Sequence, residues 1–402
     1  MVKIAVLGYG TVGGGVVDLI HINADEIAKH LGEEVQLGYI LDLRTFPNDP
    51  YESYIVSDFE KIISDQDVKI VCEALGGTEP AYSFTKRLLQ QGVSVCTSNK
   101  ELVANHGPEL LEIASNHKCN YMFEASVGGG IPIIRPMQSS LAQEKIVSIT
   151  GILNGTTNFI LTKMERENSD FNVVLKEAQD LGYAELNPEA DVEGHDACRK
   201  IAILSSLAYG KTVDFAEIET KGITKISQID FEYAKQLGMT IKLLATSKMV
   251  EDKCFAAVAP CMIAKNHPLY GVNEVFNAVL VKGNMVGNTM YYGPGAGKYP
   301  TASAIVADVL DCARHLGIAV KTSWSKEKQE LASNAEACSK YFVRVESGEK
   351  ELVQELFGEL NASCEIIADE FGFITNEVSQ AQLNTYLAKL QSVRSVLRME
   401  EA

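Results

Sequence analysis

Residues 2–20 read VKIAVLGYGTVGGGVVDLI, and this stretch decides the fold of the amino-terminal part of the chain. An apolar run of β-forming residues leads into the spacing Gly-x-Gly-x-x-Gly, after which a helical pattern begins. The first glycine allows a tight turn, the second lets the backbone approach a pyrophosphate, and the third lets the helix pack on the strand. The stretch therefore predicts a dinucleotide-binding turn, with a plain strand-to-helix turn as the alternative. The residues of the predicted turn are Gly8, Gly10, Thr11, Val12 and Gly13.

The residues that follow alternate between strand-like and helix-like patterns. Further β-rich runs occur at 35–43, 68–75, 93–98 and 119–125, and segments such as 12–31 and 81–91 have helical periodicity. This alternation predicts an α/β fold with a Rossmann-type, doubly wound parallel sheet. We expect a dinucleotide-binding domain over residues 1–135, completed by a helix near 301–318.

The remainder of the chain has a different organisation. Residues 136–300 mix strands and helices and predict an α+β domain for catalysis and dimerisation. A polar connection at 325–337 precedes the tail, residues 338–402, which has the pattern β-α-β-β-α-β of a ferredoxin-like plait.

The composition excludes several functional classes. The formal net charge is -17, and a surface of this sign repels nucleic-acid phosphates and anionic lipids. No apolar run is long enough to span a membrane, and the chain enters its first strand without room for a signal sequence. The 9 cysteines are scattered and contain no CxxC pair, which predicts reduced, buried structural thiols and a cytoplasmic protein.

The end of the second predicted strand bears on the choice of dinucleotide. Asp42 can accept hydrogen bonds from a ribose 2′-hydroxyl, which favours NAD, whereas Arg44 can hold a 2′-phosphate, which favours NADP. Both cofactors therefore stay open. The spacing from Gly13 to Asp42 is longer than usual and predicts an extended first helix.

Residues 184–202, AELNPEADVEGHDACRKIA, place many carboxylates ahead of one lysine. Asp196 and Lys200 are four residues apart and share one face of a predicted helix. An exposed ion pair explains this spacing, but the helix continues as an apolar run that can bury the lysine and tune its proton exchange. The sequence leaves the two interpretations equally open.

Three other segments carry candidate functional residues. Lys100 lies at a strand-to-helix junction on the carboxyl edge of the sheet, where ligands bind in open α/β folds. The glycines at 128–130 can gather carbonyls around a cation or form a flexible junction. Asn154 and the polar residues after it lie between a strand and a helix, where capping explains one of them but not all.

These motifs together resemble the homoserine dehydrogenase family over almost the full length of the chain. The segments TSNKELVA, FEASVGGGIPII, GILNGTTNFILTKM and GPGAGKYPTASAIVAD are similar to family motifs and occur in the family's order. The most specific match is the acidic stretch, through Ala178, Gly182, Tyr183, Ala184, Asn187, Pro188, Asp191, Val192, Gly194, Asp196 and Lys200. The tail resembles an ACT module, and we expect a monofunctional chain without an aspartate-kinase segment.

The resemblance implies a reaction and assigns roles to residues. It implies reversible reduction of L-aspartate 4-semialdehyde to L-homoserine by NAD or NADP, in threonine and methionine biosynthesis. Lys200 is then the proton donor, Asp196 holds its amine and the substrate, and Glu185 binds the substrate's α-ammonium. Lys100 approaches both nicotinamide and substrate, and Gly182 belongs to the substrate-binding segment.

The resemblance also implies ligands and partners beyond the substrate. A monovalent cation, sodium, is expected at the carbonyls of Val127, Gly129 and Ile131 with Glu124 nearby, and Gly297 is expected to touch the cofactor. Threonine is the effector expected at the ACT module, and family members are usually homodimers or homotetramers. Family members that prefer NADP often carry a basic residue where this chain has Asp42, so the resemblance does not transfer a cofactor preference.

Two other functions are distinguishable from this one. A phosphorylating semialdehyde dehydrogenase needs a thiolate nucleophile beside a base, and no cysteine here lies in such a motif. A sensor that binds NAD(P) and an effector without turnover has no need of the Asp196–Lys200 pair.

Overall fold

The computed structural model describes residues 1–333, 335 and 337–401, and the chain folds into two compact units. Unit 1 comprises Met1–Glu144, Ala202–Asp214 and Tyr291–Lys328, and unit 2 comprises Lys145–Ile201, Phe215–Met290 and Gln329–Ala402. Residues 334 and 336 of the predicted polar connection, and residue 402 of the predicted tail domain, lie outside the described residues.

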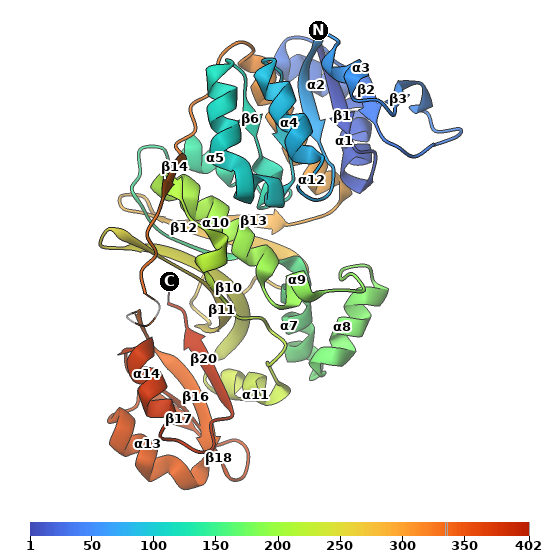
Figure 1. The fold of residues 1–402 in the computed structure, drawn as a ribbon. Helices are drawn as coiled ribbons and strands as arrows, with labels where there is room; N and C mark the ends of the chain where they lie inside the picture. The colour runs from blue at the N-terminus through green and yellow to red at the C-terminus, as the bar shows by residue number, and fades with distance from the viewer. Residues whose placement is uncertain (334, 336, 402) are drawn as a thin grey trace. The chain divides into compact units, whose positions relative to one another are not determined.

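A six-stranded parallel sheet with the order β3-β2-β1-β4-β5-β6 forms the centre of unit 1 (Figure 1). Its strands are β1 (Val2–Leu7), β2 (Val35–Leu41), β3 (Ile55–Val56), β4 (Val68–Glu73), β5 (Ser94–Thr97) and β6 (Tyr121–Met122). The strand order reverses between β1 and β4, and ligands of such sheets bind beyond the carboxyl ends of the strands at this point. The predicted Rossmann-type sheet is confirmed, although the two-residue edge strand β3 was not predicted.

Helices cover both faces of this sheet. They are α1 (Thr11–Ile22), α2 (Ala24–Leu31), α3 (Glu60–Ile63), α4 (Ala81–Gln90), α5 (Lys100–Asn116), α6 (Ile134–Gln138) and α12 (Lys298–Arg314). α4 and α5 lie on one face (Figure 1), whereas α1 and α12 share an apolar core with the other. The late helix predicted near 301–318 is therefore present in unit 1, beginning earlier and ending earlier than predicted.

The predicted extended first helix is wrong, because the segment is broken into α1 and α2 at Asn23. The backbone N–H of Asn23 donates to the Leu19 carbonyl, and the Asn23 carbonyl accepts from Ile27. Asparagine favours helix ends over helix interiors because its side chain competes for backbone hydrogen bonds. The extra residues before Asp42 therefore form a second helix.

Unit 2 is built on a mixed sheet with the order β13-β12-β7-β10-β11-β20-β16-β18-β17, and β9 also pairs with β11. The strands outside the tail are β7 (Ile146–Ile152), β9 (Glu219–Thr220), β10 (Met239–Val250), β11 (Lys253–Ala264), β12 (Phe276–Gly283) and β13 (Gly287–Pro294). The helices outside the tail are α7 (Gly155–Glu167), α8 (Phe171–Asp180), α9 (Glu189–Val192), α10 (His195–Tyr209) and α11 (Gln228–Gln236). Only the first part of α10, up to Ile201, belongs to unit 2. β8 (Lys211–Thr212) and β14 (Ser325–Lys328) form a separate parallel pair that belongs to unit 1, so part of the predicted polar connection is a strand.

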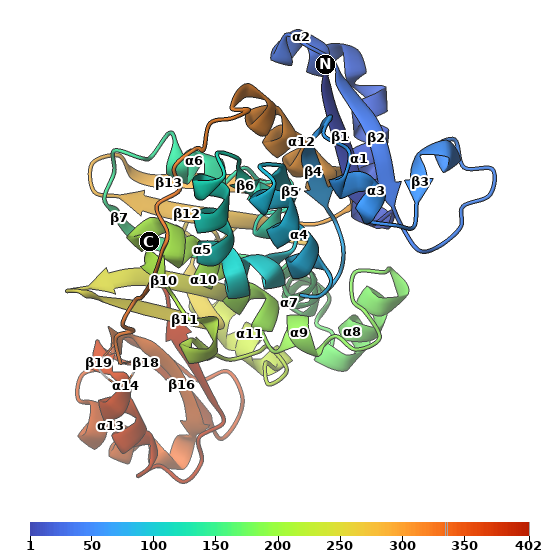
Figure 2. The ribbon, with the colours of Figure 1, turned by 45° about the horizontal axis from the view of Figure 1, so that its top comes forward.

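The tail has the predicted element order. It comprises β16 (Tyr341–Glu346), α13 (Lys350–Phe357), β17 (Ala362–Cys364), β18 (Glu370–Ile374), α14 (Gln380–Leu387) and β20 (Ser395–Met399). β18 lies between β16 and β17, which is the split arrangement of a ferredoxin-like plait. α13 and α14 cover one face of these strands and close an apolar core with them (Figure 2). A short antiparallel pair, β15 (Cys338–Ser339) with β19 (Val378–Ser379), lies beside it.

Two of the nine cysteines depart from the predicted burial. Cys338 is exposed and Cys364 is half-buried, whereas the others are buried. Both belong to short strands of the tail, β15 and the edge strand β17, which have few residues to cover them. Within the described residues, no helix combines the length and the apolar character that crossing a membrane requires.

Candidate active site

The glycine turn after β1 has the geometry that a dinucleotide needs. Gly8 has φ +91°, and a Cβ added there would lie 2.8 Å from the carbonyl oxygen of Ala74. A Cβ at Gly13 would overlap the carbonyl oxygen of Gly8, so only glycine lets the helix begin this close to the strand. A Cβ at Gly10 would meet nothing within 4 Å, which leaves open space at the position that faces a pyrophosphate.

The N-terminus of α1 is also suited to an anion. Gly10 is the N-cap and supplies no side-chain hydrogen bond, and the first turn contains no acidic residue. Thr11 and Val12 begin the helix, with Thr11 exposed and Val12 half-buried. The first backbone N–H groups and the positive end of the helix dipole therefore remain available to phosphate oxygens.

Asp42 and Arg44 contact each other at the end of β2. Asp42 accepts hydrogen bonds from the Tyr9 backbone at 2.8 Å and from the Arg44 guanidinium at 2.8 and 3.0 Å. The guanidinium holds the pKa of Asp42 well below its usual range, so this carboxylate is ionised. Arg44 also donates to the Tyr9 carbonyl at 3.1 Å, and its side chain is 62% exposed. Both residues that bear on the choice of dinucleotide thus lie together beside the glycine turn.

Lys100 is the first residue of α5 and is half-buried. The preceding residue, Asn99, caps this helix by accepting a hydrogen bond from the Leu102 N–H at 3.0 Å. The structure therefore confirms that Lys100 lies at a strand-to-helix junction on the carboxyl edge of the sheet.

A buried carboxyl group that the sequence analysis did not single out lies at the same edge of the sheet. Glu73 ends β4 and is fully buried, and burial raises its pKa to about 7. It accepts hydrogen bonds from the Thr97 hydroxyl at 2.5 Å and from the Leu75 N–H at 2.7 Å, and the Thr97 hydroxyl accepts from the Asn99 N–H at 2.9 Å. An acid at the end of an apolar strand was the signal that could have found it. Glu73 fixes the segment that leads into Lys100.

Glu124 has a structural role that its predicted position near a cation did not indicate. Its carboxylate accepts hydrogen bonds from the backbone N–H groups of Ile133, Ile134 and Arg135 at 2.6, 2.8 and 2.7 Å. These are the groups that the start of α6 leaves without helical partners. Glu124 therefore ties together the two ends of the loop that contains the three consecutive glycines.

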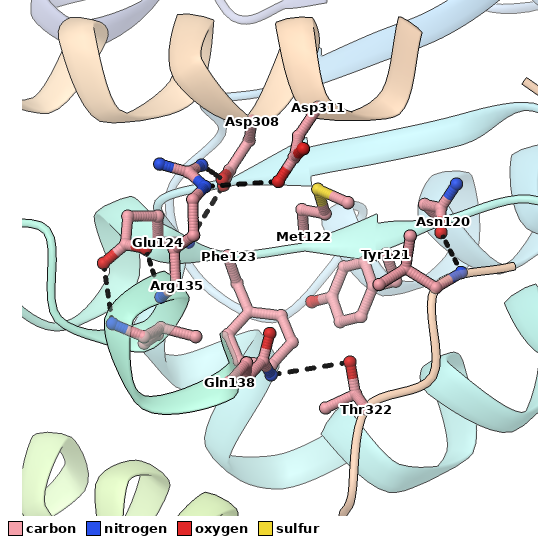
Figure 3. Close-up of a pocket in the computed structure, with 12 residues that line it drawn as sticks. Asn120, Tyr121, Met122, Phe123, Glu124, Arg135, Gln138, Asp308, Asp311 and Thr322 are labelled. Carbon is pink, nitrogen blue, oxygen red and sulfur yellow. Dashed lines mark hydrogen bonds and ion pairs between the residues drawn. The ribbon is translucent and has the colours of Figure 1, made fainter. Parts of the chain in front are cut away.

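A second set of charged residues anchors this loop to α12 (Figure 3). Asp308 accepts from the Glu124 N–H at 2.9 Å and from the Arg135 guanidinium at 2.5 Å, and Arg135 also donates to Asp311 at 3.2 Å. Burial raises the pKa of Asp308 to about 8, with the nearby charge of Glu124 as the second cause. These side chains line a cavity of about 50 Å³ together with Tyr121. The sequence analysis missed Asp308 and Arg135, because only the fold brings α12 to this loop.

The glycine turn itself can present carbonyl oxygens. Val127 and Ile131 are buried, and Gly129 has φ +56°. A Cβ at Gly128 would lie 2.7 Å from the Ile131 carbonyl oxygen, so glycine is required for this oxygen to approach the turn. Among the described residues, no group of three or more histidine, cysteine or carboxylate side chains is placed to hold a metal ion. Backbone carbonyl oxygens are among the ligands that hard cations accept in proteins.

The glycine-rich turn at residues 293–297 lies against the turn at residues 128–130 within unit 1. A Cβ at Gly129 would overlap the carbonyl oxygen of Gly295, and the Gly130 N–H donates to the Pro294 carbonyl at 3.1 Å. Gly297, with φ +119°, is the N-cap of α12 and gives this helix no side-chain cap. α12 therefore offers a second helix N-terminus of the kind that holds phosphate groups.

Unit 2 contains a buried pair of opposite charges. Lys200 and Asp196 are only 8% and 4% exposed, and the Lys200 Nζ donates to Asp196 Oδ2 at 2.8 Å. The same amine donates to the backbone carbonyl of Leu153 at 2.8 Å. The interpretation as an exposed surface ion pair is therefore wrong. Burying two charges is costly unless they are paired and hydrogen-bonded, and this pair meets both conditions.

Asn154 holds the acidic stretch in place around this pair. Its amide nitrogen donates to Asp191 at 2.8 Å and to Asp196 at 3.0 Å, and its oxygen caps α7 by accepting from the Thr157 N–H at 2.9 Å. The sequence analysis attributed one of the polar residues after this strand to helix capping and left the others unexplained, and Asn154 proves to be the cap. The cluster of Lys200, Asp196, Asp191 and Asn154 thus combines one ammonium with two carboxylates.

The remaining predicted substrate residues are on the surface of unit 2. Glu185 and Gly182 are exposed, in the segment between α8 and α9, and Gly182 has φ +76°. The segment is joined to α7 by the hydrogen bond from the Thr156 hydroxyl to the Tyr183 carbonyl at 2.6 Å. Among the described residues, the Glu185 carboxylate has no hydrogen-bond or ion-pair partner. It is therefore available to a ligand, but the structure does not bring it into contact with Lys200.

A Rossmann-type domain with open glycine turns, in a chain that also buries a paired lysine, defines an NAD(P)-dependent oxidoreductase. Comparison with known proteins agrees with this class. The family model described as homoserine dehydrogenase matches residues 132–310, and the model described as homoserine dehydrogenase, NAD binding domain, matches residues 8–124.

Individual relatives and solved structures give the same result. The chain is 36% identical to homoserine dehydrogenase of Bacillus subtilis over 99% of its length and 98% of the relative, and 45% identical to that of Synechocystis over 77% and 73%. The crystal structure of a homoserine dehydrogenase from Thiobacillus denitrificans matches with a TM-score of 0.91 and 33% identity, covering 100% of this chain and 98% of the other. A hyperthermophilic archaeal homoserine dehydrogenase in complex with NADPH matches with a TM-score of 0.67 and 27% identity, covering 80% and 99%. The chain belongs to the homoserine dehydrogenase family.

Proposed function

We propose that the chain catalyses the reversible reduction of L-aspartate 4-semialdehyde to L-homoserine, with Lys200 as the proton donor. The observation that carries this proposal is the buried contact of Lys200 with Asp196 and with the Leu153 carbonyl. A carboxylate at hydrogen-bond distance stabilises the ammonium form of a lysine, which is the form that can donate a proton.

The proton transfer follows from the chemistry of the carbonyl group. The reduced nicotinamide supplies the hydride, and the aldehyde oxygen gains negative charge as the hydride adds. An ammonium at this oxygen stabilises the charge and then gives up its proton. In the reverse direction, the neutral amine of Lys200 takes the proton from the hydroxyl group of homoserine.

The zwitterionic end of the substrate needs partners of its own. We propose that Glu185 binds the α-ammonium group, since its carboxylate is exposed and without a partner among the described residues. Asp196 holds the substrate as well as the amine, Gly182 gives the segment its turn, and Lys100 contacts both the nicotinamide and the substrate. Glu185 at the zwitterionic end of the substrate and Lys200 at the aldehyde end then fix its orientation.

The cofactor is a nicotinamide dinucleotide, and we leave NAD and NADP as equal candidates. The first glycine turn, α1 and Gly297 would hold its phosphates, while Asp42 and Arg44 would face the adenosine ribose. We further propose a sodium ion at the carbonyls of Val127, Gly129 and Ile131, supported by the close approach of the Ile131 carbonyl to Gly128. The charge of Glu124 adds to the attraction for a cation.

The roles of the chain segments complete the proposal. Residues 1–135 with the helix near 301–318 bind the cofactor, and residues 136–300 bind the substrate and join subunits into a homodimer or homotetramer. Residues 338–402 form an ACT-like module whose effector is threonine. The plait topology of the tail supports this last assignment.

The test of the proton donor is the variant Lys200→Met, assayed by absorbance of the reduced nicotinamide with homoserine and with each dinucleotide. We expect kcat to fall by at least about 100-fold, the lower bound for general acid–base catalysis, with binding of the dinucleotide unchanged. Dinucleotide binding, followed by fluorescence, shows that the variant is folded. Unchanged turnover in a folded variant would refute the assignment.

A further inference from the structure

A cavity of about 550 Å³ opens in unit 2 where the large sheet divides. One wall is the segment 219–226, the floor is β11 around residues 255–260, and the opposite wall is formed by α14 and β20 of the tail. Cavities of this size hold small molecules in proteins. Neither Lys200 nor Asp196 is among the residues that line it, so it is separate from the candidate active site.

The cavity exists because β11 changes its neighbour along its length. β9 pairs with β11 at Ala257 and Val258, whereas β20 pairs with it at Cys261 and Met262. Pro260 lies between these two pairings and has no backbone N–H to leave unsatisfied. The edge of the strand can therefore stay open at this point without stranding a donor.

The walls of the cavity are apolar at one side. Leu383, Leu387 and Val396 from the tail line it, together with Phe255 from β11. Val396 is 37% exposed although it lies on a strand of the plait. These side chains form a surface that an apolar group would remove from water, at a gain of about 25 cal/mol per Å² of apolar surface buried.

Cationic groups occupy the other side. Arg398 has a side chain only 11% exposed, with its guanidinium 5.5 Å from the centre of the Phe255 ring. Its Nη2 donates to Thr246 at 3.2 Å and to Glu400 at 2.8 Å, and its Nε has no acceptor among the described residues.

Further cations line the same cavity. Lys225 is exposed and has no ion-pair partner among the described residues, whereas Lys221 pairs with Glu219 at 2.8 Å. In a chain of net charge -17, such a grouping of cations beside an apolar wall is suited to an anion with an apolar body.

The segment 219–226, which forms one wall of the cavity, is hydrogen-bonded to the segment 191–196, which carries Asp191 and Asp196. The Ile223 N–H donates to the Val192 carbonyl at 2.8 Å, and the Thr224 hydroxyl donates to Glu193 at 3.0 Å. A Cβ at Gly222 would overlap the Val192 carbonyl oxygen, so the two segments are in close contact. Val192 and Glu193 lie between Asp191 and Asp196 in the chain. A shift of segment 219–226 is therefore transmitted to the residues around Lys200.

We propose that this cavity binds a small carboxylate with an apolar body and that its occupation alters turnover through segments 219–226 and 191–196. The carboxylate contacts Arg398 and Lys225, and the apolar body lies against Leu383, Leu387 and Val396. The binding part stands alone, whereas the effect on turnover rests on the proposed function of Lys200.

The binding test compares three probes of similar size on the full chain by titration calorimetry. The probes are 3-phenylpropionate, phenethylamine and 3-phenylpropan-1-ol, which share the apolar body and differ in charge. We expect the acid to bind at least tenfold more tightly than the alcohol, and the amine more weakly than either. Equal binding of the three, or no binding of the acid, would overturn the proposal.

Matched variants locate the site. Val396→Trp should fill the cavity and abolish binding of the acid, whereas Val393→Trp, at a residue equally exposed at 37% but outside the cavity lining, should leave it unchanged. Lys225→Gln, at an exposed residue, should weaken binding of the acid severalfold. Binding that survives Val396→Trp would place the acid elsewhere and overturn the site.

The effect on turnover is measured separately, with homoserine and the dinucleotide. We expect saturating 3-phenylpropionate to change kcat or KM for homoserine at least twofold in the parent chain and in Val393→Trp, and not in Val396→Trp. Binding without any change in turnover would overturn the coupling while leaving the site. Because binding is read without turnover, an inactive chain would refute the proposed function and not the site.

Discussion

Two buried lysines of unit 2, Lys200 and Lys242, have opposite surroundings. Lys200 on α10 pairs with the carboxylate of Asp196 at 2.8 Å. Lys242 on β10 is 0% exposed and donates only to neutral oxygens, the Val272 carbonyl at 2.7 Å and the Asn273 side chain at 2.9 Å. Burial lowers the pKa of Lys242 to about 8. Burial beside neutral oxygens therefore makes Lys242 lose its proton more easily, whereas a carboxylate at hydrogen-bond distance favours the ammonium form of a lysine.

One helix presents an asparagine to each lysine cluster. Asn154 begins α7 and donates to Asp196, the partner of Lys200, at 3.0 Å. Asn158, one turn later, accepts from Lys242 at 3.4 Å and donates to the carbonyls of Glu274 and Phe276 at 3.0 Å. The first cluster is charged and belongs to the candidate active site, whereas the second fastens a loop to the sheet.

The largest expected effect comes from making the surroundings of Lys200 resemble those of Lys242. Asp196→Asn keeps the shape of the side chain but removes its charge. We expect kcat to fall about 100-fold, because the ammonium loses the partner that maintains it. The loss of rate should grow with rising pH, since the proton of Lys200 is then lost at a lower pH. The pH dependence of kcat measures this.

The control is Glu189→Gln, an exposed carboxylate in the same acidic stretch. Its kcat should stay within about twofold, because a solvated charge contributes little to an interaction it does not contact. An equal loss of rate in both variants would show that the overall negative charge matters rather than the pair.

The second prediction concerns the stability contributed by Lys242. Its pKa in the folded chain is about 8, below the 10.5 of a lysine in water, so between these values the unfolded state binds more protons. Stability then rises with pH across this window, by up to about 3 kcal/mol for this one group. Below pH 8 the full penalty for burying the charge remains. Glu165 and Glu274 oppose the shift, and Arg166 adds to it.

The measurement is urea unfolding of the parent chain and of Lys242→Met from pH 7 to pH 10. The difference between their unfolding free energies should move in favour of the parent as the pH rises, because the methionine variant lacks this proton. A difference that is constant with pH would mean that Lys242 keeps its charge in the folded chain.

The smallest expected effect comes from replacing each of the two asparagines of α7 by alanine. Asn154→Ala should lower kcat about tenfold, the value of one hydrogen bond to a charged group, and cost about 1 kcal/mol of stability through the lost helix cap. Asn158→Ala should cost about 2 kcal/mol through carbonyls left unsatisfied and leave kcat within about twofold.

Ser227→Ala removes the serine hydroxyl from the capping box that Ser227 forms with Asp230 at the start of α11 in the same unit, and it controls for the loss of a helix cap. It should lower the free energy of unfolding by about 1 kcal/mol without changing kcat. A similar kcat for both asparagine variants would contradict the division between a catalytic and a structural cluster.

The sequence predicted the parts of the site that are contiguous in the chain more completely than the parts that distant segments form together. The turn from Gly8 to Gly13 is contiguous, and Gly8 and Gly13 allow the tight turn and the close helix–strand packing that their spacing indicated. The position of Lys100 at a helix start followed from the strand before it. The burial of Lys200 was left open, because a spacing of four residues is the same on an exposed helix and on a buried one.

The sequence analysis missed contacts between residues that lie far apart in the sequence. Glu73 and Thr97 are adjacent only because β4 and β5 pair in register. Asp308 contacts Glu124 only because α12 returns to unit 1 after a long excursion of the chain. No periodicity or motif carries information about such pairs, since their cause is the packing of elements.

The sequence by itself determined the class of fold, the dinucleotide turn and the order of the elements, because each depends on residues that are neighbours along the chain. Only the tertiary structure decided which charges are buried. Whether an ammonium keeps its proton depends on the groups within a few ångströms of it. For Lys200 these are Asp196 on the same helix and the Leu153 carbonyl from a distant segment, and for Lys242 they are the distant Val272 and Asn273.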